Sequence, residues 1–312
     1  MPSEPIFHHY LPSFYQSRWT GADGRLRRYR QVHGGKIDRK WVYPTQSGGE
    51  DYLYSDPTKP VGEAQWVEKN FMSPMDSLAH DALTMIEAGD PRINRESKAR
   101  SAWSRFLMSL MMRMPNDIET LKTSLNEEWL LRIPKLEQEY LKKKQPGGPA
   151  TFAEYLESRG SKDFESWAIS IAPKLIDHRL IGSMINNMRW FFRQVSGHSE
   201  FLTSDRPILT LYEFASQDSY IMLPIGPRRL FVAVNNIETQ RLIERRESVE
   251  FVAGINRLIV GAAKEFVFAC DDSHSEFVTE HFGKRPRTTM FEHLQRLRRK
   301  KREEASNAGR DS

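Results

Sequence analysis

Cysteine is nearly absent from this sequence, because Cys270 is the single one among 312 residues. One thiol excludes an internal disulfide and a thiolate cluster for zinc. The apolar run 266–269 before it is typical of the surroundings of a small buried side chain. A chain without disulfides fits a reducing compartment.

Long apolar runs are also missing. No stretch approaches the roughly 20 residues that cross a bilayer. Residues 1–5 lack the charged and apolar regions of a signal peptide. We therefore predict a cytoplasmic protein with no membrane partner.

The familiar catalytic signatures do not occur. The chain contains no GxxxxGK phosphate loop, no HExxH zinc helix, no GxSxG nucleophile turn and no CxxC pair. Their absence weighs against nucleotide switches and the common hydrolases.

Charge of one sign is only slightly in excess, since 46 basic residues face 41 acidic ones, which gives a net charge of +5. The excess gathers near the N-terminus and near the C-terminus. Such basic runs can hold a nucleic-acid backbone electrostatically, although a solvated helix end followed by a frayed tail is the alternative. The predicted nucleic-acid contacts are Arg27, Arg28, Arg298, Arg299 and Lys300.

What is present is enough apolar material for a core: 39% of the residues are hydrophobic. Apolar residues recur at helical spacing in the middle of the chain, and alternation with period two begins near residue 187. We predict an α+β fold with a mainly helical middle and an antiparallel sheet of about four strands in the C-terminal third. Residues 1–283 are expected to form one globular domain, with an N-terminal clamp and hairpin (1–55), a helical part (56–186) and a sheet with late helices (187–283), followed by a basic flexible tail (284–312).

One stretch combines a strand-like pattern with an acid. Residues 201–207 read FLTSDRP, and Asp205 falls where the alternation ends. We predict that residues 188–195 and 201–209 form a hairpin, with Asp205 on the returning strand. Asp205 is then either a site residue or the cap of the turn at Arg206-Pro207.

A pair of histidines near the start is the other candidate. On an extended segment His8 and His9 point to opposite sides, so one of them can face a polar pocket. If that histidine meets Asp205, the carboxylate could orient the imidazole as a general base, which makes all three candidate catalytic residues. A divalent metal ion held by His9 and Asp205 is a further option. The alternative is a structural clamp in which a backbone carbonyl satisfies His9.

Four polar residues near these candidates are predicted to support the site. Asn256 lies among apolar residues of a predicted helix, where its amide must find partners, either in the site or in a neighbouring loop. Thr203, Ser204 and Tyr10 stand beside the candidate acid and the histidines in the sequence. We expect these four residues to support the site.

The motif HHYLPxFY over residues 8–15, together with FLTSDxP over 201–207, resembles a widespread bacterial family of domains of unknown function. That family also has a Pro-x-x-Pro-like step, similar to residues 224–227, and a late asparagine, similar to Asn256. The resemblance spans residues 8–270. The chain departs from the family pattern at residues 16–19, which puts the local packing there in doubt.

The resemblance implies that His8, His9 and Asp205 belong to one feature, and it assigns no activity. Two hypotheses follow. The chain is a metal-dependent hydrolase or nuclease that acts on nucleic acid, or it is a non-catalytic binding or interaction module with a structural His–Asp clamp. Two geometric observations distinguish these hypotheses. One is whether His8 or His9 lies within hydrogen-bond distance of Asp205, and the other is whether that place is an open pocket or sealed core.

Overall fold

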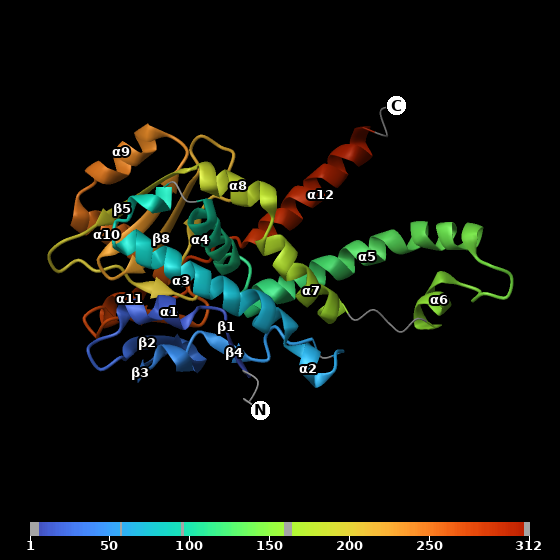
Figure 1. The fold of residues 1–312 in the computed structure, drawn as a ribbon, viewed down its shortest axis with the longest axis horizontal. Helices are drawn as coiled ribbons and strands as arrows, with labels where there is room; N and C mark the ends of the chain where they lie inside the picture. The colour runs from blue at the N-terminus through green and yellow to red at the C-terminus, as the bar shows by residue number, and fades with distance from the viewer. Residues whose placement is uncertain (1–5, 57, 95–96, 159–163, 309–312) are drawn as a thin grey trace.

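The computed structural model describes residues 6–56, 58–94, 97–158 and 164–308. Helices fill the middle of the chain and antiparallel sheets flank it, so the predicted α+β class is confirmed (Figure 1). The strands are β1 (Phe7–His9), β2 (Leu26–Gln31), β3 (Ile37–Val42), β4 (Gly49–Asp51), β5 (Arg189–Gln194), β6 (Thr203–Ser204), β7 (Leu209–Thr210), β8 (Tyr220–Gly226), β9 (Arg229–Val234) and β10 (Phe266–Ala269).

The helices differ widely in length. The helices of the N-terminal half are α1 (Ser13–Gln16), α2 (Val61–Ala64), α3 (Ser73–Glu87), α4 (Ser97–Leu110) and α5 (Pro115–Lys143). Those that follow are α6 (Phe152–Ser158), α7 (Phe164–Ile176), α8 (Arg179–Asn187), α9 (Ile237–Arg245), α10 (Ser248–Ala262), α11 (Ser275–His281) and α12 (Met290–Ala308). No helix in the described ranges combines the length and apolar character needed to cross a membrane.

The first four-stranded sheet has the order β5-β9-β8-β7 and is antiparallel throughout. Phe231 on one face packs against Trp103 of α4, with ring centroids 5.6 Å apart. Val232 on the other face belongs to a cluster with Phe251 and Ile255 of α10. Both faces are covered, which explains why β8 and β9 are apolar at nearly every position. This sheet confirms the one predicted for the C-terminal third.

The second four-stranded sheet, of order β3-β2-β10-β6, joins the N-terminal hairpin to the end of the domain. Its edge strand β6 corrects the predicted hairpin, because residues 203–204 pair with β10 and not with β5. The reason lies in the preceding residues. The N–H of Phe201 donates to Pro227 and that of Leu202 donates to the side chain of Asn256, so no hydrogen bond of either leads to β5.

A two-stranded sheet of β1 and β4 places the start of the chain against residues 49–51. Gly49 is required there, because a Cβ at this position would lie 2.5 Å from the ring of Phe7 and 2.7 Å from the carbonyl of His8. The short β1 strand is therefore fixed by close backbone contact.

Helices α5 and α12 extend away from the sheets (Figure 1). They contact one another through Gln295, whose amide donates to Ser124, and through an ion pair of Arg299 with Glu127. Residues 290–308 form the helix α12, although they belong to the segment 284–312 that was predicted as a basic flexible tail. The α12 helix begins at the edge of the site described next.

Candidate functional site

Asp205 lies at the end of β6 and is 2% exposed. Its carboxylate accepts hydrogen bonds from three consecutive backbone N–H groups, those of Lys264, Glu265 and Phe266, with distances of 3.0 Å for Lys264 and 3.1 Å for Phe266. Burial raises the pKa of Asp205, and these hydrogen bonds oppose that effect. Asp205 therefore caps the turn at residues 264–266, which leads into the neighbouring strand β10, and not the turn at Arg206-Pro207.

His8 is buried completely. Its Nδ1 accepts the N–H of Tyr54 at 3.0 Å, and its Nε2 lies 2.7 Å from the amide oxygen of Gln65. An acceptor at Nδ1 requires the proton on Nε2, which fixes one neutral tautomer. The ring also stacks on Tyr54 with an interplanar angle of 8°. His8 therefore occupies a packed position in the core.

His9 points to the opposite side of β1, as the alternation predicts, and is partly exposed. Its Nε2 lies 3.0 Å from the hydroxyl of Ser13. Burial lowers the pKa of His9, while a hydrogen bond to the backbone of Pro44 raises it. Among the described residues, the carboxylate of Asp205 has its hydrogen bonds with the backbone groups named above and none with a histidine. The structure thus does not join the predicted catalytic residues.

The two sequence motifs do meet, through aromatic side chains. The hydroxyl of Tyr15 lies 2.8 Å from that of Thr203 and donates to the carbonyl of Pro224 at 2.7 Å. The indole of Trp19 donates to the carbonyl of Phe201 at 2.8 Å. These contacts hold the N-terminal segment against residues 201–203, and we call them the aromatic clamp.

The predicted supporting residues extend the clamp. Asn256 binds the segment just before β6 at two points. Its side-chain oxygen accepts from the N–H of Leu202 at 2.9 Å, and its nitrogen donates to the carbonyl of Glu200 at 2.8 Å. The hydroxyl of Ser204 donates to the carbonyl of Ile259. Tyr10 donates to the carboxylate of Glu265 at 3.2 Å, beside the turn that Asp205 caps. Sequence reasoning missed Tyr15 and Trp19, although both carry a polar tip on an apolar ring, which is typical of buried residues with one partner.

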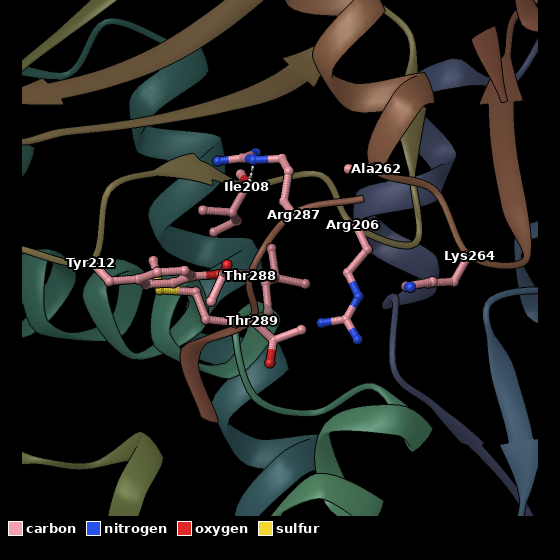
Figure 2. Close-up of a pocket in the computed structure, with 10 residues that line it drawn as sticks. Arg206, Ile208, Tyr212, Ala262, Lys264, Arg287, Thr288 and Thr289 are labelled. Carbon is pink, nitrogen blue, oxygen red and sulfur yellow. Dashed lines mark hydrogen bonds between the residues drawn. The ribbon is translucent and has the colours of Figure 1, made fainter. Parts of the chain in front are cut away.

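Next to the clamp is a cavity lined by Arg206, Lys264 and Arg287 (Figure 2). The Nη1 of Arg206 contacts both oxygens of Asp117 at 2.8 and 2.7 Å. Its Nε and Nη2 are buried and have no hydrogen-bond partner among the residues that the structure describes. The guanidinium of Arg206 extends between Thr289 and the ammonium of Lys264 (Figure 2). A buried guanidinium with two free N–H groups is an incomplete hydrogen-bonding site.

A family model described as Protein of unknown function (DUF4238) matches residues 8–273. The chain belongs to the DUF4238 family. The match begins at His8 and includes both motifs, so the resemblance to a family of unknown function is confirmed. No curated protein and no solved structure matches the chain.

In this DUF4238 member the cavity lies at the end of the FLTSDRP motif. Arg206 occupies the variable position of the FLTSDxP motif, whereas Lys264 follows α10 and Arg287 precedes α12. Arg287 donates to the carbonyls of Ile208 and Thr210, which fixes its position. Sequence reasoning treated Arg206 only as part of a turn and missed the other two. The available signal was an arginine directly after the motif aspartate Asp205.

Tyr212, which also lines the cavity, has a φ of 62°. This left-handed conformation is unfavourable for a residue with a side chain, by roughly 1–3 kcal/mol. Such strain persists where the surrounding structure imposes it, and it is concentrated at functional sites.

A second polar cluster in the DUF4238 chain is connected to His8 through Tyr54, whose N–H donates to His8 and whose hydroxyl donates to the carbonyl of Arg113. Arg113 is fully buried and donates to Asp76 at 2.9 Å, and its Nε and Nη2 have no hydrogen-bond partner in the described part of the chain. Burial and the charge of Asp76 raise the pKa of Glu68 to about 7. Glu68 begins a π-helical turn, Glu68–Met72, a rare element that is frequent at functional sites.

No group of three or more His, Cys, Asp or Glu side chains in the described ranges is arranged to hold a metal ion. His9 and Asp205, the predicted metal ligands, have the separate hydrogen-bond partners given above. The donor set of the cavity is cationic, which suits an anion and not a metal ion.

The predicted nucleic-acid contacts divide into two distant groups. Arg27 and Arg28 lie on β2, and Arg298, Arg299 and Lys300 lie on α12, and these two elements are well separated (Figure 1). Arg27 pairs with Asp272 and Arg28 lies over the ring of Phe266. The two groups do not form one continuous basic face.

Proposed function

We propose that this protein is a binding module for a small anionic ligand, which enters the cavity of Arg206, Lys264 and Arg287. The observation that carries the proposal is that Nε and Nη2 of Arg206 are buried and have no hydrogen-bond partner among the described residues, in a side chain that is 13% exposed. Buried polar groups without partners are rare in native proteins, and each calls for a ligand, a water or a functional reason.

The clamp has a structural part in this proposal. Tyr15, Trp19 and Asn256 fix residues 200–203, and Asp205 fixes the turn at residues 264–266. These contacts fix the position of Arg206 relative to Lys264, because Arg206 follows Asp205 in the chain and Lys264 is one of the residues that Asp205 caps. The motifs then maintain the cavity, and the ligand contacts come from the cations beside them.

The proposal predicts that sodium salts of acetate, succinate, sulfate or phosphate raise the unfolding temperature above a sodium chloride control of equal ionic strength. Lys264→Ala should weaken the binding of the stabilising anion about 3- to 10-fold, because an exposed ammonium at the cavity is lost. Lys174→Ala, an exposed lysine outside the cavity lining, is the matched control. If no anion stabilises the protein beyond sodium chloride, the proposal is wrong.

The hydrolase hypothesis remains the second candidate, and one observation favours it. Burial raises the pKa of Glu68 to about 7, and its Oε2 is buried with no hydrogen-bond partner within the described ranges, which suits a general base better than the capped Asp205. Cleavage of DNA or RNA with magnesium or manganese present is expected to fall about 100-fold or more in Glu68→Gln. Asp205→Asn should retain activity in the same assay. Cleavage that persists in Glu68→Gln would exclude this role for Glu68.

A further inference from the structure

The cavity is lined by three cationic side chains and two threonines, which is more hydrogen-bond donors than one carboxylate can accept from. We infer that the ligand presents a terminal phosphate dianion to Arg206, an inference that rests on the proposed function. The two sources of this group are inorganic phosphate and the phosphate monoester of a small metabolite. Four features of the cavity lead to this chemistry.

The first feature is the geometry of the free donors. Nε and Nη2 of Arg206 stand on the same edge of the planar guanidinium, while Nη1 is occupied by Asp117. Two parallel N–H groups match two oxygens of a phosphate in a bidentate contact. The third and fourth oxygens of the tetrahedral group then project toward other lining residues. Thr288, Thr289 and Lys264 offer donors there.

The second feature is the balance of charge. The cavity is lined by three cationic side chains, and none of its described lining residues carries a carboxylate. The nearby acids are already engaged: Asp205 with the turn at residues 264–266, Asp117 with Arg206, and Glu292 with the N–H of Thr289. Backbone N–H donors do not cancel the charges of Asp205 and Glu292, so the preference for an anion comes from the three cations that line the cavity directly while the carboxylates lie outside its lining.

The third feature is the start of α12. Thr289 is its N-cap, since its hydroxyl accepts the N–H of Glu292 and its own N–H donates to the Glu292 carboxylate. This capping box places the positive end of a 19-residue helix at the cavity wall. Helix N-termini bind phosphate through this field and their free N–H groups. Here the field adds to a buried arginine that already faces the same space.

The fourth feature is size. The space open to the centre of a water-sized sphere is about 30 Å³. At roughly 10–15 Å³ for each water, the cavity holds two or three waters, which is the room that a phosphate group needs. A sugar or a base does not fit beside it. The remainder of a monoester would lie outside, at the mouth of the cavity.

The test compares glycerol 3-phosphate, inorganic phosphate, dimethyl phosphate, sulfate and acetate at pH 7.5, with dissociation constants taken from the ligand dependence of the unfolding temperature. We expect glycerol 3-phosphate to bind at least tenfold more tightly than acetate and the monoanionic diester dimethyl phosphate. Equal binding of inorganic phosphate identifies the bare group as the ligand. Tighter binding of glycerol 3-phosphate assigns the ester, with contacts at the mouth.

A pH series separates the dianion from other anions. The second ionisation of a monoester has a pKa of about 6, so its dianion fraction rises about tenfold between pH 5 and 7.5, whereas sulfate stays a dianion. The affinity of glycerol 3-phosphate relative to sulfate should rise by that factor, because titration of the protein cancels in the ratio. Lys264→Ala should reduce the affinity for both anions, and Lys174→Ala should leave both unchanged.

The possible failures are distinguishable. Acetate that binds as tightly as glycerol 3-phosphate, with loss of both in Lys264→Ala, would overturn the phosphate inference and leave the anion site standing. A flat affinity ratio across the pH series would overturn it as well. Phosphate binding that is unchanged in Lys264→Ala would place the ligand elsewhere. If none of the five anions binds, the proposed function fails together with the inference.

Discussion

Asp205→Ala is expected to lower the free energy of unfolding by about 3–5 kcal/mol. The change leaves the N–H groups of Lys264, Glu265 and Phe266 without their acceptor; a buried unsatisfied group such as that of Phe266 costs roughly 1–3 kcal/mol, and the part-buried groups of Lys264 and Glu265 cost less. The midpoint and slope of urea unfolding measure the effect. A large loss would identify Asp205 as a structural residue whatever the protein binds.

Asp205→Asn is the matched control for that experiment. The amide keeps one oxygen that can accept hydrogen bonds from the turn, so most of the stability should remain. If Asp205→Ala costs less than about 1 kcal/mol, the carboxylate does not secure the turn, and a role in the site becomes the better explanation.

Arg206→Met is expected to destabilise the protein by about 3–5 kcal/mol at pH 8, because it leaves Asp117 buried without its partner. Burial already raises the pKa of Asp117 to about 6 in the intact pair, and Arg206 opposes that rise. Without Arg206 the pKa of Asp117 rises further. The loss of stability in Arg206→Met should therefore be smaller at pH 5 than at pH 8. At pH 5 the Asp117 carboxyl of the folded variant is protonated and neutral. At pH 8 the folded variant must either bury an unpaired carboxylate or bind a proton from a solution that contains few.

The double variant Arg206→Met/Asp117→Leu tests this explanation, because it removes both charges and should recover most of the lost stability. Arg241→Met breaks an exposed pair with Glu238 and should cost less than about 1 kcal/mol at either pH. Equal costs of Arg206→Met at pH 5 and pH 8 would contradict the assignment to Asp117.

The direction of the pH effect in the intact protein follows from the same group. The folded state of Asp117 binds its proton up to about pH 6, while the unfolded carboxyl releases it near its ordinary value of 3.8. Between these values the folded state holds more protons, so this residue contributes stability that is lost as the pH rises through 6. Acid unfolding is therefore not driven by Asp117.

The sequence was sufficient for the fold class because the evidence for it is local. The helical spacing of the middle and the apolar strands β8 and β9 depend on neighbours a few residues apart. The pairing of β6 was predicted wrongly, because a run such as FLTS does not reveal which strand it meets. Its partner was decided by Asn256 and Trp19, which are distant in the chain.

The candidate site was only partly accessible for the same reason. The opposite directions of His8 and His9 follow from strand geometry, and a capping role for Asp205 was one of the two alternatives considered. The cavity could not be predicted, since the free N–H groups of Arg206 become visible only when its partner Asp117 is known. Lys264 and Arg287 reach the same space from segments far along the chain.

The aromatic clamp also limits how early the N-terminal segment can fold during synthesis. Tyr10, Tyr15 and Trp19 emerge first from the ribosome, yet their partners Glu265, Thr203 and Phe201 follow only after most of the chain has been made. These long-range contacts cannot form early, and the loop that each closes carries an entropy cost. Residues 10–19 therefore cannot dock on these partners until most of the segment between them has been synthesised.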